Sequence, residues 1–402
     1  MPSPLPRLGS WPVLVALATL AGLAAAAHLL GQTPGAIGAR QSFALLAGAA
    51  FGLTLQRGRF CFLCNLRDLT RDGDPRGVLA ILAALAIGAI GYAAVFGAWV
   101  PNPFGGRLPP TAHVGPVSPA LAVAAFVFGV GMALSGSCLS AHLYRLGEGS
   151  PTSPFALVGA VAGFVLGFQT WNPIFLASVA EAPVVWLPAV LGYPGWLALT
   201  LAVLAGLAAL ALARSRPVSP TTAEPLTLRG AARATLADRW PALPTGLLVG
   251  LIGTLAYLRV APLGVTAEIG SAARTAAGAA GLLPSTLFGL DGLRGCATVV
   301  KETLLSENGL FVLGLVAASF AAALVSGRFA PALPNRGQVL RGLAGGALMG
   351  WGAMTALGCT VGVLLSGIQA GALAGWVFLV FVTLGALAAD WTAKRVVRRA
   401  KG

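Results

Sequence analysis

Cysteines at glycine-rich turns are the residues of this sequence best suited to chemistry. The segment GVGMALSGSC ends at Cys138 and the segment GWGAMTALGC ends at Cys359, so in both the cysteine follows the first glycine by nine residues. Cys61 and Cys296 each come shortly after an Arg-Gly pair. A thiol is a soft, polarisable and weak hydrogen-bond donor. Several such donors in series would bind a solute with a soft terminal sulfur and still release it.

Positive charge beside these turns indicates an anionic solute. Two arginines precede Cys61, and a basic residue stands on each side of Cys296. Broken helices add to this charge, because the free N–H groups at a helix start attract anions. We therefore expect a substrate-binding and translocation path made by the following residues: Cys138, Cys296, Cys359, Cys61, Arg57, Arg59, Arg294 and Lys301.

A buried cysteine can also have a purely structural role. A lone cysteine in a membrane helix more often fills a hole between helices than it takes part in function. Cys64 has no counterpart in the second half of the chain and is interpreted as such a packing residue. Cys138 and Cys359 differ, because they occupy equivalent turns in the two halves, and we interpret them as functional.

Cys61 and Cys64 form a CxxC pair, which supports a second interpretation. Neighbouring arginines could stabilise a thiolate, so the chain could be a membrane thiol oxidoreductase or sulfurtransferase that uses this pair. We prefer the transporter, because the pair lacks the βαβ pattern of thioredoxin-like enzymes. No second CxxC completes a zinc site and no Walker A motif is present, so we expect no metal, no cofactor and no ATP hydrolysis.

The composition excludes a soluble protein of this size. Of 402 residues, 57% are hydrophobic and 9% are charged, whereas soluble domains carry about 25% charged residues. Membrane lipid is therefore the main solvent of the chain. The net charge of +14 is best explained by topology, because arginine-rich loops remain on the cytoplasmic side. No basic stretch is interleaved with aromatic residues, so we expect no nucleic acid partner.

The apolar runs predict an all-α polytopic membrane protein with about nine transmembrane helices plus four short broken or re-entrant segments. The nine long runs lie at 11–30, 77–99, 117–135, 154–172, 195–213, 243–258, 309–326, 338–356 and 372–391. The four glycine-interrupted stretches lie at 41–66, 136–148, 263–305 and 357–369. Non-helical backbone survives in a bilayer only where protein or water covers it. These four stretches therefore imply a protein-lined interior.

A basic linker at 214–240 divides the chain into two membrane repeats. The first repeat and a connecting helix occupy 1–213, the second repeat occupies 241–391, and a basic tail follows at 392–402. The positive-inside rule places the linker and the tail, hence the C-terminus, in the cytoplasm. Nine crossings then leave the N-terminus outside. Equivalent segments of the two repeats cross in opposite senses, which is the inverted-repeat plan of many transporters.

Three segments, RGRFCF (57–62) and the two that end at Cys138 and Cys359, resemble the YeeE/YedE family of membrane proteins. The resemblance covers most of the chain and implies a bacterial inner-membrane protein that takes up a sulfur compound, with thiosulfate as the expected substrate. It implies an hourglass-like core with Cys138, Cys296 and Cys359 on the route and Cys61 near its cytoplasmic side. It also suggests a small cytoplasmic sulfur carrier or sulfurtransferase as a partner. Cys64 and the Pro- and Arg-rich linker depart from the family pattern, which leaves other sulfur or selenium species open as substrates.

Overall fold

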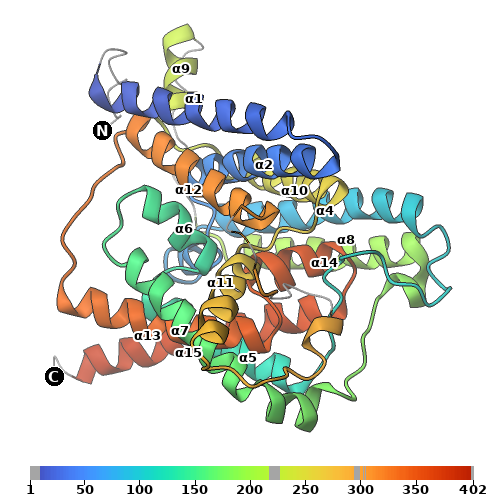
Figure 1. Cartoon of the computed structure of the whole chain (residues 1–402). Helices are drawn as coiled ribbons and strands as arrows, with labels where there is room; N and C mark the ends of the chain where they lie inside the picture. Colours follow the sequence, from blue (N-terminus) through green and yellow to red (C-terminus); the bar gives the residue numbers. More distant parts are fainter. Residues whose placement is uncertain (1–9, 217–226, 294–298, 302, 304, 400–402) are drawn as a thin grey trace.

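The computed structural model of the chain describes residues 10–216, 227–293, 299–301, 303 and 305–399. These residues form helices joined by turns, and among them two isolated bridges are the nearest approach to a strand (Figure 1). Nine of the described helical segments are long and apolar enough to cross a membrane, and one further pair bends by 44° at a short break. The expected all-α membrane protein with about nine spans and additional broken segments is confirmed.

Long helices and short segments are interspersed along the chain. The long helices are α1 (Trp11–Gly31), α2 (Ala36–Gly58), α4 (Arg76–Trp99), α5 (Pro119–Ser135), α7 (Ser153–Ile174), α8 (Pro188–Ala213), α10 (Ala242–Arg259), α11 (Val265–Ala279), α12 (Glu307–Val325), α13 (Arg336–Thr355) and α15 (Leu373–Arg399). The short segments are α3 (Phe62–Arg67), η1 (Asp68–Asp72), α6 (Leu139–Gly147), η2 (Phe175–Val179), α9 (Leu228–Leu236), η3 (Leu290–Gly292), η4 (Thr360–Ser366) and α14 (Gly367–Gln369).

Polar capping residues mark where several of the apolar helices begin. Ser118 Oγ accepts the backbone N–H of the third residue of α5, and Ser306 does the same for α12. At α13, Asn335 and Gln338 form a reciprocal capping box. Each cap gives a partner to an N–H group that the helix itself leaves unpaired. The helix starts are therefore encoded locally, beside the apolar runs.

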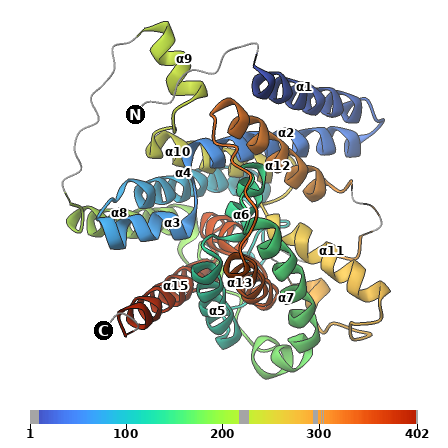
Figure 2. The same ribbon diagram turned by 90° about the vertical axis from the view of Figure 1, so that its left-hand side faces the viewer.

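The spanning helices form two groups with the short segments between them. The first group contains α2, α4, α10 and α12, and the second contains α5, α7, α13 and α15 (Figure 1). Figure 2 shows α6 between the two groups, where it packs on α12 from one side and on α7 from the other. Likewise, α14 contacts both α4 and α15. The broken segments are thus covered by protein, as their unpaired backbone groups require.

The packing partners of the two halves match each other. We pair α2 with α10, α4 with α12, α5 with α13 and α7 with α15 by their order in each half. In the structure α2 packs on α12 and α4 on α10, while α7 packs on α13 and α5 on α15. When each of these eight helices is replaced by its counterpart, the contact of α2 with α12 becomes that of α10 with α4, and the contact of α7 with α13 becomes that of α15 with α5. This arrangement is compatible with the expected inverted repeat.

One element differs from the expectation. The stretch 41–66 was expected to be short and broken, but α2 is a continuous helix of 23 residues and the break comes only after it. Its glycines do not interrupt the helix, because they provide close contacts instead. A Cβ at Gly48 or Gly52 would overlap the backbone of α12, and one at Gly246 or Gly250 of α10 would crowd the backbone of α4. Such small-residue pairs let membrane helices approach closely.

These contacts predict different costs for the same substitution at two glycines. Gly52→Ala should lower the free energy of unfolding by about 1–3 kcal/mol, because the new methyl group meets the α12 backbone at Leu315. Gly22→Ala is the matched control in α1, where no atom lies within 4 Å of an added Cβ. Thermal unfolding of the two purified variants in detergent measures the stability of each. Equal melting temperatures for the two variants would contradict the assigned packing.

Candidate functional site

Three cysteines occupy the same position relative to a chain reversal. Cys61, Cys138 and Cys359 are the N-cap residues of α3, α6 and η4. In each case the residue two positions earlier has a left-handed backbone, with φ values of 51°, 89° and 57° respectively. Glycine tolerates that conformation best, and it is present at the second of these turns as Gly136. The recurring geometry therefore includes Cys61 as well as the two cysteines that the sequence pattern had paired.

The turns bring three thiols together in the interior. Cys61 is within hydrogen-bonding reach of both Cys64 and Cys138, and all three side chains are buried, with at most 7% of their surface exposed. The Cys138 sulfur also shares a 3.3 Å hydrogen bond with the Ser140 hydroxyl. We call Cys61, Cys64 and Cys138 the thiol cluster. Cys64, interpreted from the sequence as a packing residue, is thus one of its members.

Arg145 is a residue of this site that the sequence analysis missed. Its Nη2 donates a 3.3 Å hydrogen bond to the Cys64 sulfur. Arg145 lies on α6, seven residues after Cys138, which is two helical turns and therefore the same face of the helix. That spacing was the signal that could have identified it. The guanidinium places positive charge directly against the thiol cluster.

Two small cavities lie on either side of the Cys359 turn. One cavity, of about 20 Å³, is lined by Cys138 and Ser140 together with Thr360 and Val361. The other, also about 20 Å³, is lined by His113 and Thr355 among others, and by Leu357. Each has room for about one water molecule. Because Leu357 lines one cavity and Val361 the other, the turn that carries Cys359 separates them.

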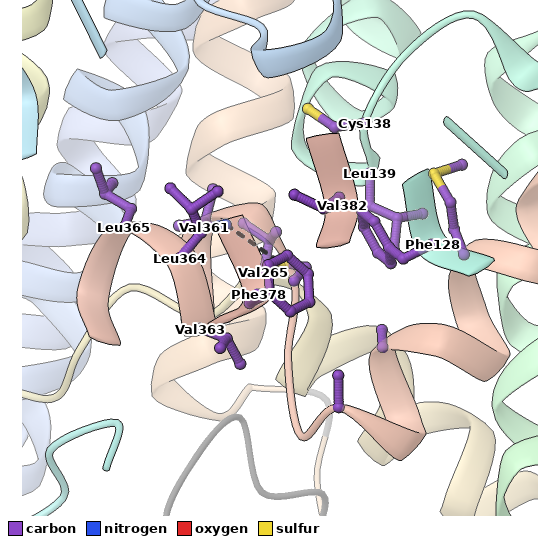
Figure 3. Close-up of a cluster of buried hydrophobic side chains, with 14 of the residues drawn as sticks. Phe128, Cys138, Leu139, Val265, Val361, Val363, Leu364, Leu365, Phe378 and Val382 are labelled. Carbon is purple, nitrogen blue, oxygen red and sulfur yellow. Dashed lines mark hydrogen bonds between the residues drawn. The ribbon is translucent and has the colours of Figure 1, made fainter. Parts of the chain in front are cut away.

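Apolar side chains close the space around this turn. Figure 3 shows Cys138 above a cluster to which η4 contributes Val361, Val363 and Leu364. Cys359 belongs to the same buried cluster and has no exposed surface, and its sulfur accepts the backbone N–H of Val361 at 3.4 Å. Apolar side chains thus separate the two small cavities at this turn, and an apolar constriction of this kind excludes water.

His113 is a second residue that the sequence analysis missed. Its Nδ1 lies 2.7 Å from the carbonyl oxygen of Gly362 in η4, and its ring lines the cavity that also contains Thr355. The Thr355 hydroxyl is buried and has no hydrogen-bond partner within the described part of the chain. His113 stands in a loop far from any cysteine in the sequence, so spacing alone offered no signal for it.

The predicted basic site residues that the structure describes form hydrogen bonds and ion pairs with groups other than the thiols. The buried Arg57 guanidinium donates to the backbone carbonyls of Thr235, Ala237 and Asp238, and so fastens the segment after α9 to the end of α2. Arg59 forms a 3.1 Å ion pair with Asp68. Lys301 forms a largely buried ion pair with Glu268 of α11. Arg294 and Cys296 lie outside the described residues.

Ion pairs also hold the helix that carries Cys64. Arg67, at the end of α3, forms a bidentate pair with Asp390 of α15, and Arg71 reaches the same carboxylate at 2.7 Å. Since Asp390 is largely buried, removing one partner would leave its charge poorly compensated. The described residues contain no group of three metal-ligating side chains.

The thiol cluster predicts a specific cross-link. In a Cys64→Ser background, a small oxidant such as iodine should join Cys61 to Cys138, because their side chains are neighbours in the buried interior. Mass spectrometry of the digested protein would identify the linked peptides. Adding Cys138→Ser should abolish the product, whereas adding Cys359→Ser should not. A predominant link from Cys61 to Cys359 would contradict the cluster.

Sequence comparisons identify relatives along most of the chain. It is 27% identical to the thiosulfate transporter TsuA of Escherichia coli over 86% of this chain and 93% of that protein. It is 28% identical to the thiosulfate transporter TsuA of Spirochaeta thermophila, over 86% of this chain and 97% of that protein. A shorter match, 29% identical over 32% of this chain and 30% of the relative, is to the probable transporter YedE of Salmonella typhimurium.

The match to a family covers both groups of helices. The profile of the family described as sulphur transport matches residues 57–388, which include all three members of the thiol cluster and Cys359. The resemblance to the YeeE/YedE family is confirmed. Both the family and the relatives are named for transport, so the chain is a transporter rather than a thiol enzyme. With its nine described apolar spans, it is a multi-pass membrane protein that belongs to the sulphur transport family.

Proposed function

We propose that this transporter takes up thiosulfate, or a similar anion with a soft terminal sulfur, along a central path past its cysteines. The observation that carries the proposal is the burial of Cys61 and Cys138 as neighbours, although they come from different broken segments. The cavity beside Cys138 reaches the residues that follow Cys359. The names of the two full-length relatives support thiosulfate as the substrate.

The order of the path follows from the two cavities. The anion enters the cavity beside His113 and Thr355, passes the Cys359 turn when the apolar constriction widens, and reaches the thiol cluster. Thiols donate weakly to its terminal sulfur, while the Arg145 guanidinium lowers the cost of its charge in the interior. No bond to sulfur forms or breaks. Weak donors in series allow release at each step.

The direction of uptake follows from the linker. Arg57 holds the segment at 235–238, and this segment ends the basic linker that the positive-inside rule assigns to the cytoplasm. The end of α2 and the neighbouring Cys61 therefore lie toward the cytoplasmic side of a bacterial inner membrane, with the C-terminus on the same side and the N-terminus opposite. A small sulfur carrier or sulfurtransferase would receive the anion there. Arg294 and Cys296 would add a positive charge and a further thiol to the route, while the charges of Arg59 and Lys301 are balanced by Asp68 and Glu268.

Removing single thiols tests the path. Cys138→Ala and Cys359→Ala should each reduce thiosulfate uptake about tenfold, because a hydrogen bond to a charged group contributes roughly 1.5 kcal/mol at the lower end of its range. Uptake of radiolabelled thiosulfate into cells that lack other importers is the measurement, with membrane levels of each variant as the control. Cys138→Ser, which keeps a small donor, should retain more activity than Cys138→Ala. Unchanged uptake in both alanine variants would refute the thiol path.

Competition between anions tests the selection of a soft sulfur. Excess unlabelled thiosulfate should suppress uptake of the label, whereas sulfate of the same charge should compete at least about tenfold less well, since it lacks the terminal sulfur to which thiols donate. Sulfite and selenite extend the series. Equal competition by sulfate and thiosulfate would show that charge alone selects the substrate.

A further inference from the structure

A deep apolar groove lies on the outer face of the helices, next to the cavity that Cys138 lines. It runs between α8 and α15, with α3 and α4 behind it (Figure 2). Leu82 and Leu85 of α4 form its buried floor, while Leu210 of α8 and Val380 of α15 form an exposed rim. Its volume of about 480 Å³ is roughly three times that of the ~150 Å³ cavity that holds benzene. By that ratio it accommodates a chain of roughly 16–18 carbons.

Positive charge marks one end of the groove. Arg214, at the end of α8, is part of the lining, and Arg216 follows it with its backbone N–H bonded to the Gly73 carbonyl oxygen at 3.0 Å. Neither arginine forms an ion pair with any described residue, whereas nearby Arg71 pairs with Asp390. An apolar slot that ends at arginines without an ion-pair partner among the described residues matches an amphiphile with an anionic head.

We propose that the groove is a binding site for one anionic phospholipid, with an acyl chain between α8 and α15 and the phosphate at Arg214 and Arg216. The head group carries a net negative charge, because a zwitterionic lipid brings its own ammonium group and gains less from two arginines. The arginines belong to the basic side of the protein, which is the side we assign to the cytoplasm. The site therefore takes its lipid from the inner leaflet.

The bound chain would support the thiol cluster from behind. Phe62 and Ile81 line both this groove and the cavity that contains Cys138. Phe62 is the first residue of α3, directly after Cys61, and α3 also carries Cys64. An acyl chain in the groove packs against the face of α3 that points away from the thiols. Without it, that face would adjoin an unfilled space and lose dispersion contacts.

Native mass spectrometry of the purified full-length protein tests the charge requirement. Incubation with phosphatidylglycerol or phosphatidylcholine of the same acyl chains should leave one retained phosphatidylglycerol and little phosphatidylcholine. The double substitution Arg214→Gln and Arg216→Gln should weaken phosphatidylglycerol retention roughly 30-fold, or about fivefold for each arginine. Arg259→Gln, which removes an exposed arginine at the end of α10, is the control and should bind like the wild type.

A second pair of variants tests the groove itself. Leu210→Trp places a ring in the rim and should prevent retention of phosphatidylglycerol, whereas Leu212→Trp changes a similarly exposed leucine that does not line the groove. Equal retention of both lipids by the wild type, or wild-type retention by the double arginine variant, would overturn the proposal. So would equal retention by the two tryptophan variants. Native mass spectrometry measures lipid retention and involves no uptake assay. A failure of the lipid proposal is therefore distinguishable from a failure of the thiosulfate proposal.

Discussion

Unpaired peptide groups cannot remain in hydrocarbon, and this constraint governs the whole architecture. The turns before Cys61, Cys138 and Cys359 each interrupt a helix inside the membrane-embedded part of the chain. They persist because two groups of spanning helices enclose them. Close contacts at glycines such as Gly48 and Gly52 make the enclosure tight. The cost of breaking a helix thus confines the breaks to the protein centre, which is where a transport path must lie.

The chemistry of that centre differs from its surroundings. Most basic side chains near the ends of the helices are used for structure, as when Arg57 binds the linker carbonyls and Arg67 binds Asp390. In the interior around the Cys359 turn, the polar side chains are mainly thiols and hydroxyls, which are weak hydrogen-bond donors. Arg145 is the charged side chain beside them. A strongly cationic centre would hold an anion too firmly for passage. In the function proposed here, weak donors and an apolar constriction favour brief occupancy by a soft anion.

The two sides of α3 connect this centre with the lipid. One side presents Cys64 to Arg145 and to Cys61, and Phe62 at the start of the helix borders the apolar groove. Ion pairs to Asp390 hold the end of α3 against α15. A six-residue helix has little stability of its own, so its position depends on these neighbours. The bilayer is in this sense a packing partner of the site as well as a solvent for the protein.

The amino-acid sequence by itself determined the membrane class, the approximate spans, the two halves and the glycine-cysteine turns at Cys138 and Cys359, because hydropathy and turn residues act over a few neighbours. Tertiary structure alone decided that α2 continues unbroken, that Cys64 joins Cys61 and Cys138, and that Arg57 faces the linker. These outcomes depend on which surfaces meet between segments distant in the chain. A glycine breaks a free helix or tightens a packed one according to its neighbour, and local sequence does not specify that neighbour.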